Sequence, residues 1–244
     1  MKLLEPIVAW HHDISKIRRD IHAHPELAFE EFRTADVVAA KLEEWGIEVD
    51  RGLGGTGVVG IIRGNQPGDR AVGLRADMDA LPMQEVNTFA HASKNEGKMH
   101  ACGHDGHTAM LLAAAQYLSQ HRDYAGIVYV IFQPAEEGGG GAKRMIDDGL
   151  FKRFPMEAVF GMHNWPGMKP GQFGLTPGPI MASSNEFSIV VKGKGTHAGM
   201  PNLGIDPVMA AVQLAQSLQT IITRNRNPLD LSLIHISEPT RRRG

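Results

Sequence analysis

Nine residues near the middle of the chain combine several side chains that could bind a metal. Residues 99–107 (MHACGHDGH) hold three histidines, an aspartate and Cys102, the only cysteine of the chain. Imidazole, thiolate and carboxylate groups are the ligands of zinc and its first-row neighbours. Glycine and alanine between them allow a tight turn on which these side chains can converge. The segment therefore predicts a metal site, and a His-rich surface loop beside a buried cysteine is the alternative.

A predicted helix follows this segment directly. Residues 108–118 have the composition and apolar spacing of a strong helix, so the candidate ligands lie at its N-terminus. The partial positive charge of a helix N-terminus favours a deprotonated thiol and an ionised aspartate.

Three apolar stretches each run into further candidate ligands. The predicted strands are residues 71–74, 127–132 and 158–161. The side chains that follow them are Asp77, Asp79, Glu136, Glu137 and His163. Continuous apolar strands separated by helices imply a mostly parallel sheet covered on both faces. Because ligands of such sheets bind at the carboxyl ends of the strands, we expect all five side chains and the 99–107 segment to meet at one edge.

The other elements complete an α/β fold, a mostly parallel sheet flanked by helices. Apolar periodicity predicts helices at 7–23, 30–45 and 205–222, and strands at 47–49, 58–62 and 186–192. The glycine-rich residues 52–57 (GLGGTG) contain no lysine and are not followed by a helix, unlike a nucleotide-binding loop, so a turn is predicted there. Residues 65–69 are also predicted to form a turn.

Adjacent carboxylates suit hydrolysis. Of Glu136 and Glu137, one can bind a metal while its neighbour accepts a proton from an activated water. Two metal ions about 3.5–4 Å apart are common in amide and phosphate hydrolysis. Considered alone, a Glu-Glu pair is typical of a solvated helix start. Likewise, a single histidine such as His163 is most often a buried core residue with its hydrogen bonds satisfied. Their position after apolar strands favours a site.

Composition excludes several classes of partner. The chain has 244 residues, 42% of them hydrophobic and 21% charged, with a net charge of −2. No basic stripe indicates nucleic-acid binding, and no apolar run is long enough for a membrane span. The absence of a signal pattern and the single cysteine predict a cytoplasmic protein.

Six motifs together resemble the hippurate hydrolase, or N-acyl-L-amino-acid amidohydrolase, branch of the aminoacylase–carboxypeptidase metallo-hydrolase family. The motifs are HPEL at 24–27, RADMDALP at 75–82, residues 99–107, QPAEE at 133–137, GMHN at 161–164 and GKGTHAG at 193–199. The resemblance extends from the first helix to about Asp230. It implies a small N-acyl amino acid as substrate.

The resemblance also implies roles for individual residues. The implied metal ligands, for two divalent ions per subunit (zinc, manganese, cobalt or nickel), are Cys102, His104, Glu137 and His163. The implied catalytic residues are Glu136 as general base, Asp77, Asp79 and His197. Asp79 matches an aspartate that orients a metal-binding histidine, and Asp77 stands where other branches have a ligand histidine. His197 matches a histidine that stabilises the substrate oxyanion, often across a dimer; a loop histidine is its alternative. Side chains expected to hold the ligands in place are His100, Asp105 and His107.

Three segments are predicted along the chain. Residues 1–180 form the N-terminal part of a catalytic metal-binding domain, and 181–230 begin an α+β lid domain through which the full-length parent forms a homodimer. Residues 231–244 resemble the read-through of a sequencing adapter and form a non-native tail. Since the family supplies a further ligand histidine and the rest of the lid later in its sequence, we expect the 244-residue chain alone to be impaired.

Two other functions remain open. Cys102 could be a nucleophile activated by a histidine, although His104 is close to it in sequence and the strand-end carboxylates would then lack a purpose. The chain could also bind metal without catalysing a reaction.

Overall fold

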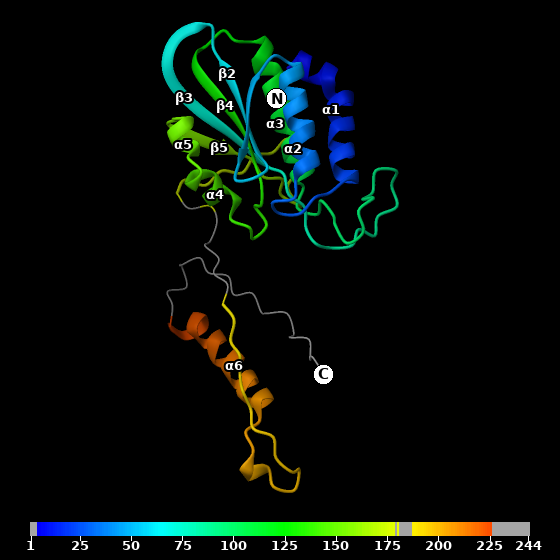
Figure 1. Cartoon of the computed structure of the whole chain (residues 1–244), viewed down its shortest axis with the longest axis vertical. Helices are drawn as coiled ribbons and strands as arrows, with labels where there is room; N and C mark the ends of the chain where they lie inside the picture. The colour runs from blue at the N-terminus through cyan, green and yellow to red at the C-terminus, as the bar shows by residue number, and fades with distance from the viewer. Residues whose placement is uncertain (1–3, 179, 181–186, 226–244) are drawn as a thin grey trace. The chain divides into compact units, whose positions relative to one another are not determined.

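The computed structural model describes residues 4–178, 180 and 187–225, which fall into two compact units (Figure 1). The units are residues 1–170 and 171–244. The predicted domain boundary lies at 180/181, and the assignment of catalytic and lid domains stays a prediction. The predicted tail, 231–244, lies outside the described residues.

A five-stranded sheet forms the centre of the first unit, with the order β1-β2-β4-β3-β5. The strands are β1 (Glu48–Leu53), β2 (Gly57–Arg63), β3 (Gln66–Asp77), β4 (Ala125–Gln133) and β5 (Ala158–Gly161). β3 runs parallel to β4 and β5, whereas β1–β2 and β2–β4 are antiparallel. The predicted α/β class is confirmed. The sheet is mixed, and its parallel half contains the three strands that precede candidate ligands.

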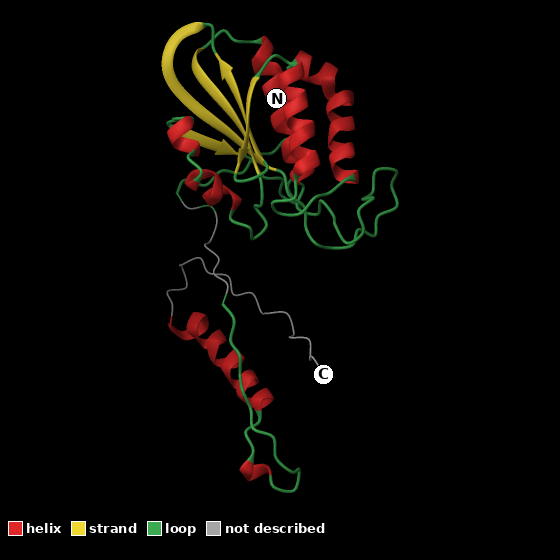
Figure 2. Ribbon diagram, in the orientation of Figure 1, coloured by secondary structure: helices red, strands yellow, loops and turns green. Residues whose placement is uncertain are grey.

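Helices cover both faces of this sheet (Figure 2). One face carries α1 (Glu5–Ala23), α2 (Phe32–Glu44) and α3 (His104–Gln120), and the other carries α4 (Gly141–Asp147) and α5 (Leu150–Arg153). Because successive side chains of a strand point to opposite faces, Val130 packs under α2 and α3 while Ile131 packs under α4 and α5. Both sets are buried, which explains why β4 is continuously apolar.

The turn predicted at 65–69 is wrong, because β3 begins at Gln66. Gln66 pairs with Ala125, and the register then shifts before Ala71 pairs with Ile127. Pro67 lies in this irregular part of the strand, where the ladder does not require its missing N–H. The helices predicted at 7–23 and 30–45, and the strands predicted at 58–62, 127–132 and 158–161, are confirmed within a few residues.

In the second unit, the predicted helix is confirmed as α6 (Pro207–Asn225), preceded by a short 3-10 turn, η1 (Pro201–Leu203). The strand predicted at 186–192 is not formed over its described part, 187–192. A strand requires a hydrogen-bonded neighbour, and the bridge in this region is the single pair Lys194–Ile205. No helix among the described residues is both long and apolar enough to cross a bilayer.

Candidate metal centre

The parallel strands bring the predicted ligands to one edge of the sheet. Asp77 is the last residue of β3 and pairs with Gln133, the last residue of β4. Arg75 pairs with Gly161, the last residue of β5. Glu136 and Glu137 follow the end of β4 within four residues, and His163 follows the end of β5 within two. They therefore lie at the same edge of the sheet as Asp77, at the end of β3. The register thus supplies the convergence that the sequence predicted.

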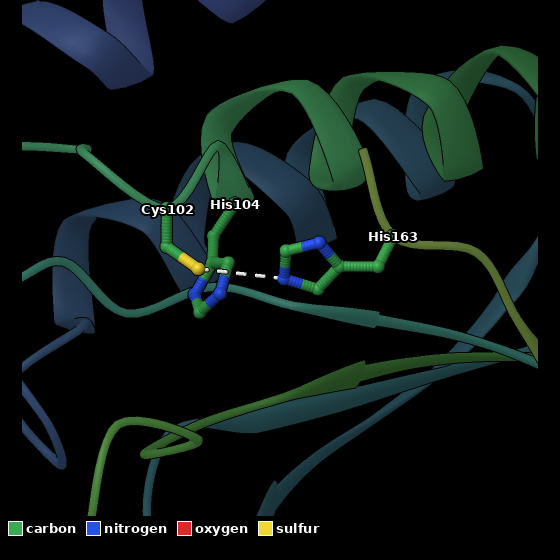
Figure 3. A group of neighbouring side chains, drawn as sticks. All are labelled: Cys102, His104 and His163. Carbon is green, nitrogen blue, oxygen red and sulfur yellow. Dashed lines mark hydrogen bonds between the residues drawn. The ribbon is translucent and has the colours of Figure 1, made fainter. Parts of the chain in front are cut away.

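The loop before α3 completes this group of side chains (Figure 3). Cys102 Sγ lies 3.3 Å from His163 Nε2, and His104 contributes a ring nitrogen to the same group. His104 is also grouped with Glu136 and Glu137, and the potential ligand atoms of each group lie within 4.8 Å of one another. These two sets together contain all four predicted ligands and Glu136. A third set consists of Asp77, His104 and His107, so His104 is common to all three.

His104 is the buried centre of this arrangement. Its Nδ1 lies 2.8 Å from the main-chain oxygen of Asp79 and 3.3 Å from Asp79 Oδ1. If Nδ1 carries the proton, as two oxygen neighbours favour, Nε2 presents a lone pair. This Nε2 is buried and has no hydrogen-bond partner among the described residues, and it lies 3.9 Å from a carboxylate oxygen of each of Glu136 and Glu137.

The donor set fits a divalent cation. An unpartnered imidazole nitrogen is costly in a buried place unless something binds it. Here a thiol, the imidazole of His163 and three carboxylates lie around it, which are the ligand types of zinc and related metals. The nearest carboxylate oxygen is Asp77 Oδ2, 3.7 Å from Nε2. The assignment of Cys102, His104, Glu137 and His163 as the ligands stays a prediction, and all four belong to these donor groups.

Charge around the centre is strongly negative. Burial raises the pKa of the Cys102 thiol to about 12, and the carboxylates of Glu137, Glu136 and Asp77 add to this effect. A nucleophilic cysteine needs a positive environment that lowers its pKa, which is the opposite of what surrounds Cys102. These surroundings do not suit a nucleophilic thiol, and they oppose the deprotonation expected from the helix N-terminus.

Asp77 is buried beneath the centre rather than exposed in it. Burial would raise its pKa, but the hydrogen bond from His107 and the neighbouring His104 and Arg75 lower the pKa to about 2. His107 Nδ1 lies 2.7 Å from Asp77 Oδ1, and Arg75 Nη1 donates to Asp77 Oδ2 at 2.8 Å. Asp77 stays ionised and fixes His107.

His107 extends this chain of contacts to His163. Its Nε2 accepts the main-chain N–H of Asn164 at 3.1 Å and also contacts Asn164 Oδ1. Asn164 in turn packs so closely against Gly103 that a Cβ there would lie 2.3 Å from Asn164 Oδ1. Asn164, the residue after His163, is therefore in contact with His107 on one side and Gly103 on the other. The supporting role expected of His107 stays a prediction.

The other two predicted supporting residues are Asp105 and His100, which belong to none of the donor groups. Asp105 Oδ2 accepts a hydrogen bond from Arg18 at 2.9 Å and lies 3.0 Å from His22 Nδ1, so it anchors α1. Glu85 contacts the other ring nitrogen of His22 at 3.1 Å. His100 is buried, and burial lowers its pKa to about 4.

His197 lies in the second unit, where its Nδ1 accepts the N–H of Gly199 at 3.1 Å. Its predicted catalytic role stays a prediction. The sequence interpretation gave no role to Asn164, Gly103 or Glu31. Of these three, only Gly103 has a local sequence signal, since it is a glycine directly before a predicted helix. In the structure its φ is 95°, a backbone conformation that favours glycine.

Comparison with known proteins gives a consistent result. The model of peptidase family M20/M25/M40 matches residues 73–241. The chain is 48% identical over 237 residues to the hippurate hydrolase of Campylobacter jejuni, covering 97% of this chain and 61% of that protein. It is 44% identical over 231 residues to an N-acetylcysteine deacetylase of Bacillus subtilis, covering 94% and 60%. The chain thus spans about 60% of the length of these relatives.

Two solved structures share the fold. A protein from methicillin-resistant Staphylococcus aureus is 36% identical with a TM-score of 0.78, covering 92% of this chain and 60% of that one. The Bacillus subtilis YXEP protein, described as a dinuclear metal binding peptidase from the M20 family, is 43% identical with a TM-score of 0.62, covering 66% and 45%.

Proposed function

The chain belongs to peptidase family M20/M25/M40, and from this membership we propose that the full-length protein hydrolyses the amide bond of N-acyl amino acids with the aid of divalent metal. The relatives named above are hydrolases of this chemical kind. The single observation that best supports the proposal is the buried, unpartnered Nε2 of His104 facing Glu136 and Glu137.

In this proposal Cys102, His104, Glu137 and His163 hold metal, with two ions per subunit of zinc, manganese, cobalt or nickel. Bound metal would acidify a water and polarise the amide carbonyl. Asp79 keeps the proton of His104 on Nδ1, so that Nε2 stays available as a donor. Asp77 holds His107, and through it Asn164 beside His163.

Glu136 takes the proton in the proposed reaction. Its side chain is 42% exposed, so a substrate and a water can reach the carboxylate. Glu136 Oε2 accepts the proton of the attacking water and later passes it to the leaving amine nitrogen. Glu137, with 24% of its side chain exposed, is the less accessible neighbour and suits a ligand.

The remaining parts of the proposal concern the whole protein. His197 would donate to the substrate oxyanion, the lid would form a homodimer contact, and the protein would act in the cytoplasm. Substrates would be small N-acyl amino acids such as hippurate, consistent with the relatives' names.

Metal binding can be tested on the 244-residue chain, and hydrolysis on the full-length protein with a panel of N-acyl amino acids. Chelation should abolish turnover and added metal should restore it. Glu136→Gln should retain the metal and lower kcat by about 10²–10⁴-fold. Turnover that survives chelation and is lost in Cys102→Ser would instead support a cysteine hydrolase. Metal binding without any turnover would support a binding protein.

A further inference from the structure

A second buried carboxylate, Glu31, supports the loop that carries Glu136 and Glu137. Glu31 lies just before α2 and is fully buried, with 0% of its surface exposed. Its Oε1 accepts the main-chain N–H of Ala135 at 2.8 Å, across 104 residues of sequence. Its Oε2 accepts the hydroxyl of Thr56 at 2.6 Å. One carboxylate therefore connects α2, the glycine-rich turn before β2 and the turn after β4.

Ala135 needs such a partner because of its backbone conformation. Its φ is 51°, in the left-handed region that residues with a Cβ rarely adopt. The residue is completely buried, so its N–H cannot bond to bulk water instead. The turn is also crowded, since a Cβ at Gly139 would lie 2.7 Å from the Cβ of Ala135. Such a strained turn persists when surrounding contacts hold it.

The two glutamates are thus fixed by a buried carboxylate on each side. Asp79 Oδ2 accepts the N–H of Glu137 at 2.9 Å, and Glu31 accepts the N–H of Ala135. Asp79 also holds His104, so it sets the ligands on both sides of the centre. Glu31 has no such direct contact with a candidate ligand among the described residues, and its effect passes through the turn.

Burial raises the pKa of Glu31, and the hydrogen bonds from Thr56 and Ala135 oppose that rise. The Glu31 carboxyl group is therefore buried at an energetic cost, which its hydrogen bonds from Ala135 and Thr56 oppose.

We propose that Glu31 is a positioning residue for the Glu136–Glu137 pair, acting by fixing the left-handed turn at Ala135. This inference rests on the proposed metal-binding role of Glu137. Without Glu31 the turn would sample other conformations, and Glu137 would lie in the correct place to bind metal for only a fraction of the time. Affinity falls in proportion to that fraction.

Three variants of the 244-residue chain test the proposal. Glu31→Ala removes both acceptors, and Glu31→Gln keeps one oxygen that can accept the Ala135 N–H. Glu30→Ala is the matched control, because Glu30 is the adjacent residue of the same type with 61% of its side chain exposed, paired with Lys98. The two measurements are hydrogen exchange of the Ala135 amide without metal, and Zn²⁺ affinity by calorimetry.

We expect Glu31→Ala to speed exchange at Ala135 and to weaken Zn²⁺ binding, each by about tenfold or more, from the loss of a buried hydrogen bond. Glu31→Gln should recover a large part of both, and Glu30→Ala should match the wild type. If Glu31→Ala does not fold, Glu31→Gln and the wild type carry the comparison.

Two results would overturn the inference. If Glu31→Ala binds Zn²⁺ with unchanged affinity, Glu31 is a purely structural residue. The same conclusion follows if Glu31→Gln speeds exchange of the Ala135 amide but leaves the Zn²⁺ affinity unchanged. Unchanged exchange at Ala135 in Glu31→Ala would remove the proposed route. Failure of the proposed function looks different: the wild-type chain itself would bind no Zn²⁺, while exchange at Ala135 would still report on Glu31.

Discussion

Asp79 holds the ring of His104 through two oxygens, with Nδ1 2.8 Å from the main-chain oxygen and 3.3 Å from Oδ1. Burial would raise the pKa of Asp79, but the hydrogen bonds from His104 and from the amides of Glu137 and Glu136 lower it. The carboxylate therefore stays charged, and it faces the side of the imidazole opposite the donors. This relationship links the end of β3 to the first residue of α3.

Changing Asp79 to Asn should weaken metal binding by about 10–100-fold, the usual effect of removing the partner of a metal-binding histidine. The amide keeps one oxygen near His104 but loses the charge that selects the ring tautomer. Calorimetric titration of the chain with Zn²⁺ measures this difference. Asp123→Asn, on an exposed residue paired with Gln66, is the matched control. Equal affinities for the two variants would show that Asp79 does not support the ligand.

Gly103→Ala should destabilise the chain more than Gly97→Ala. Both glycines have positive φ, 95° and 71°, so each alanine costs about 1–2 kcal/mol in backbone strain. Only at position 103 does the new Cβ also collide with Asn164, whereas nothing lies within 4 Å of it at Gly97. We expect an additional loss of about 1–3 kcal/mol in the free energy of unfolding, measured with urea. Equal losses would mean that the contact with Asn164 relaxes freely.

The stability supplied by His22 should depend on pH. The hydrogen bond to Asp105, aided by Glu85 and opposed by burial, raises the pKa of His22 above 6.5. A raised folded-state pKa means that the stabilisation is complete below pH 6.5 and is lost as pH rises through the folded value. The gap in unfolding free energy between the wild type and His22→Asn should therefore be largest near pH 6 and smaller at pH 9.

The exposed His12, changed to Asn in the same way, is the control for this experiment. The difference in unfolding free energy between the wild type and His22→Asn could instead be constant from pH 6 to pH 9, or increase toward pH 9. Either result would contradict the ion pairs of His22 with Asp105 and Glu85.

Periodicity was sufficient to predict the sheet and the placement of its ligands. β4 is buried on both faces and therefore continuously apolar, so 127–132 was visible, together with the carboxylates that follow it. The apolar residues of 158–161 also predicted a strand and the histidine after it, although β5 itself is exposed. The error at 65–69 has the opposite cause. Pro67 and Gly68 are typical of a turn, yet an irregular register lets β3 include them.

Contacts between distant side chains could not be predicted in this way. Glu31 reaches Ala135 across 104 residues, and His22 reaches Asp105 across 83. Neither pair has a local pattern, because each depends on how α1 and α2 pack on the sheet. The single Glu31 carboxylate reads as part of an ordinary acidic helix start.

The most direct test of the metal centre is an absorbance titration of the chain with Co²⁺. If Cys102, His104, Glu137 and His163 share metal, saturation should produce a cobalt–thiolate charge-transfer band that is absent in Cys102→Ser. His104→Ala should weaken Co²⁺ binding most, since His104 belongs to every one of the donor groups. A wild-type chain that gives no such band, or one that binds Co²⁺ equally well without Cys102 and His104, would contradict the account.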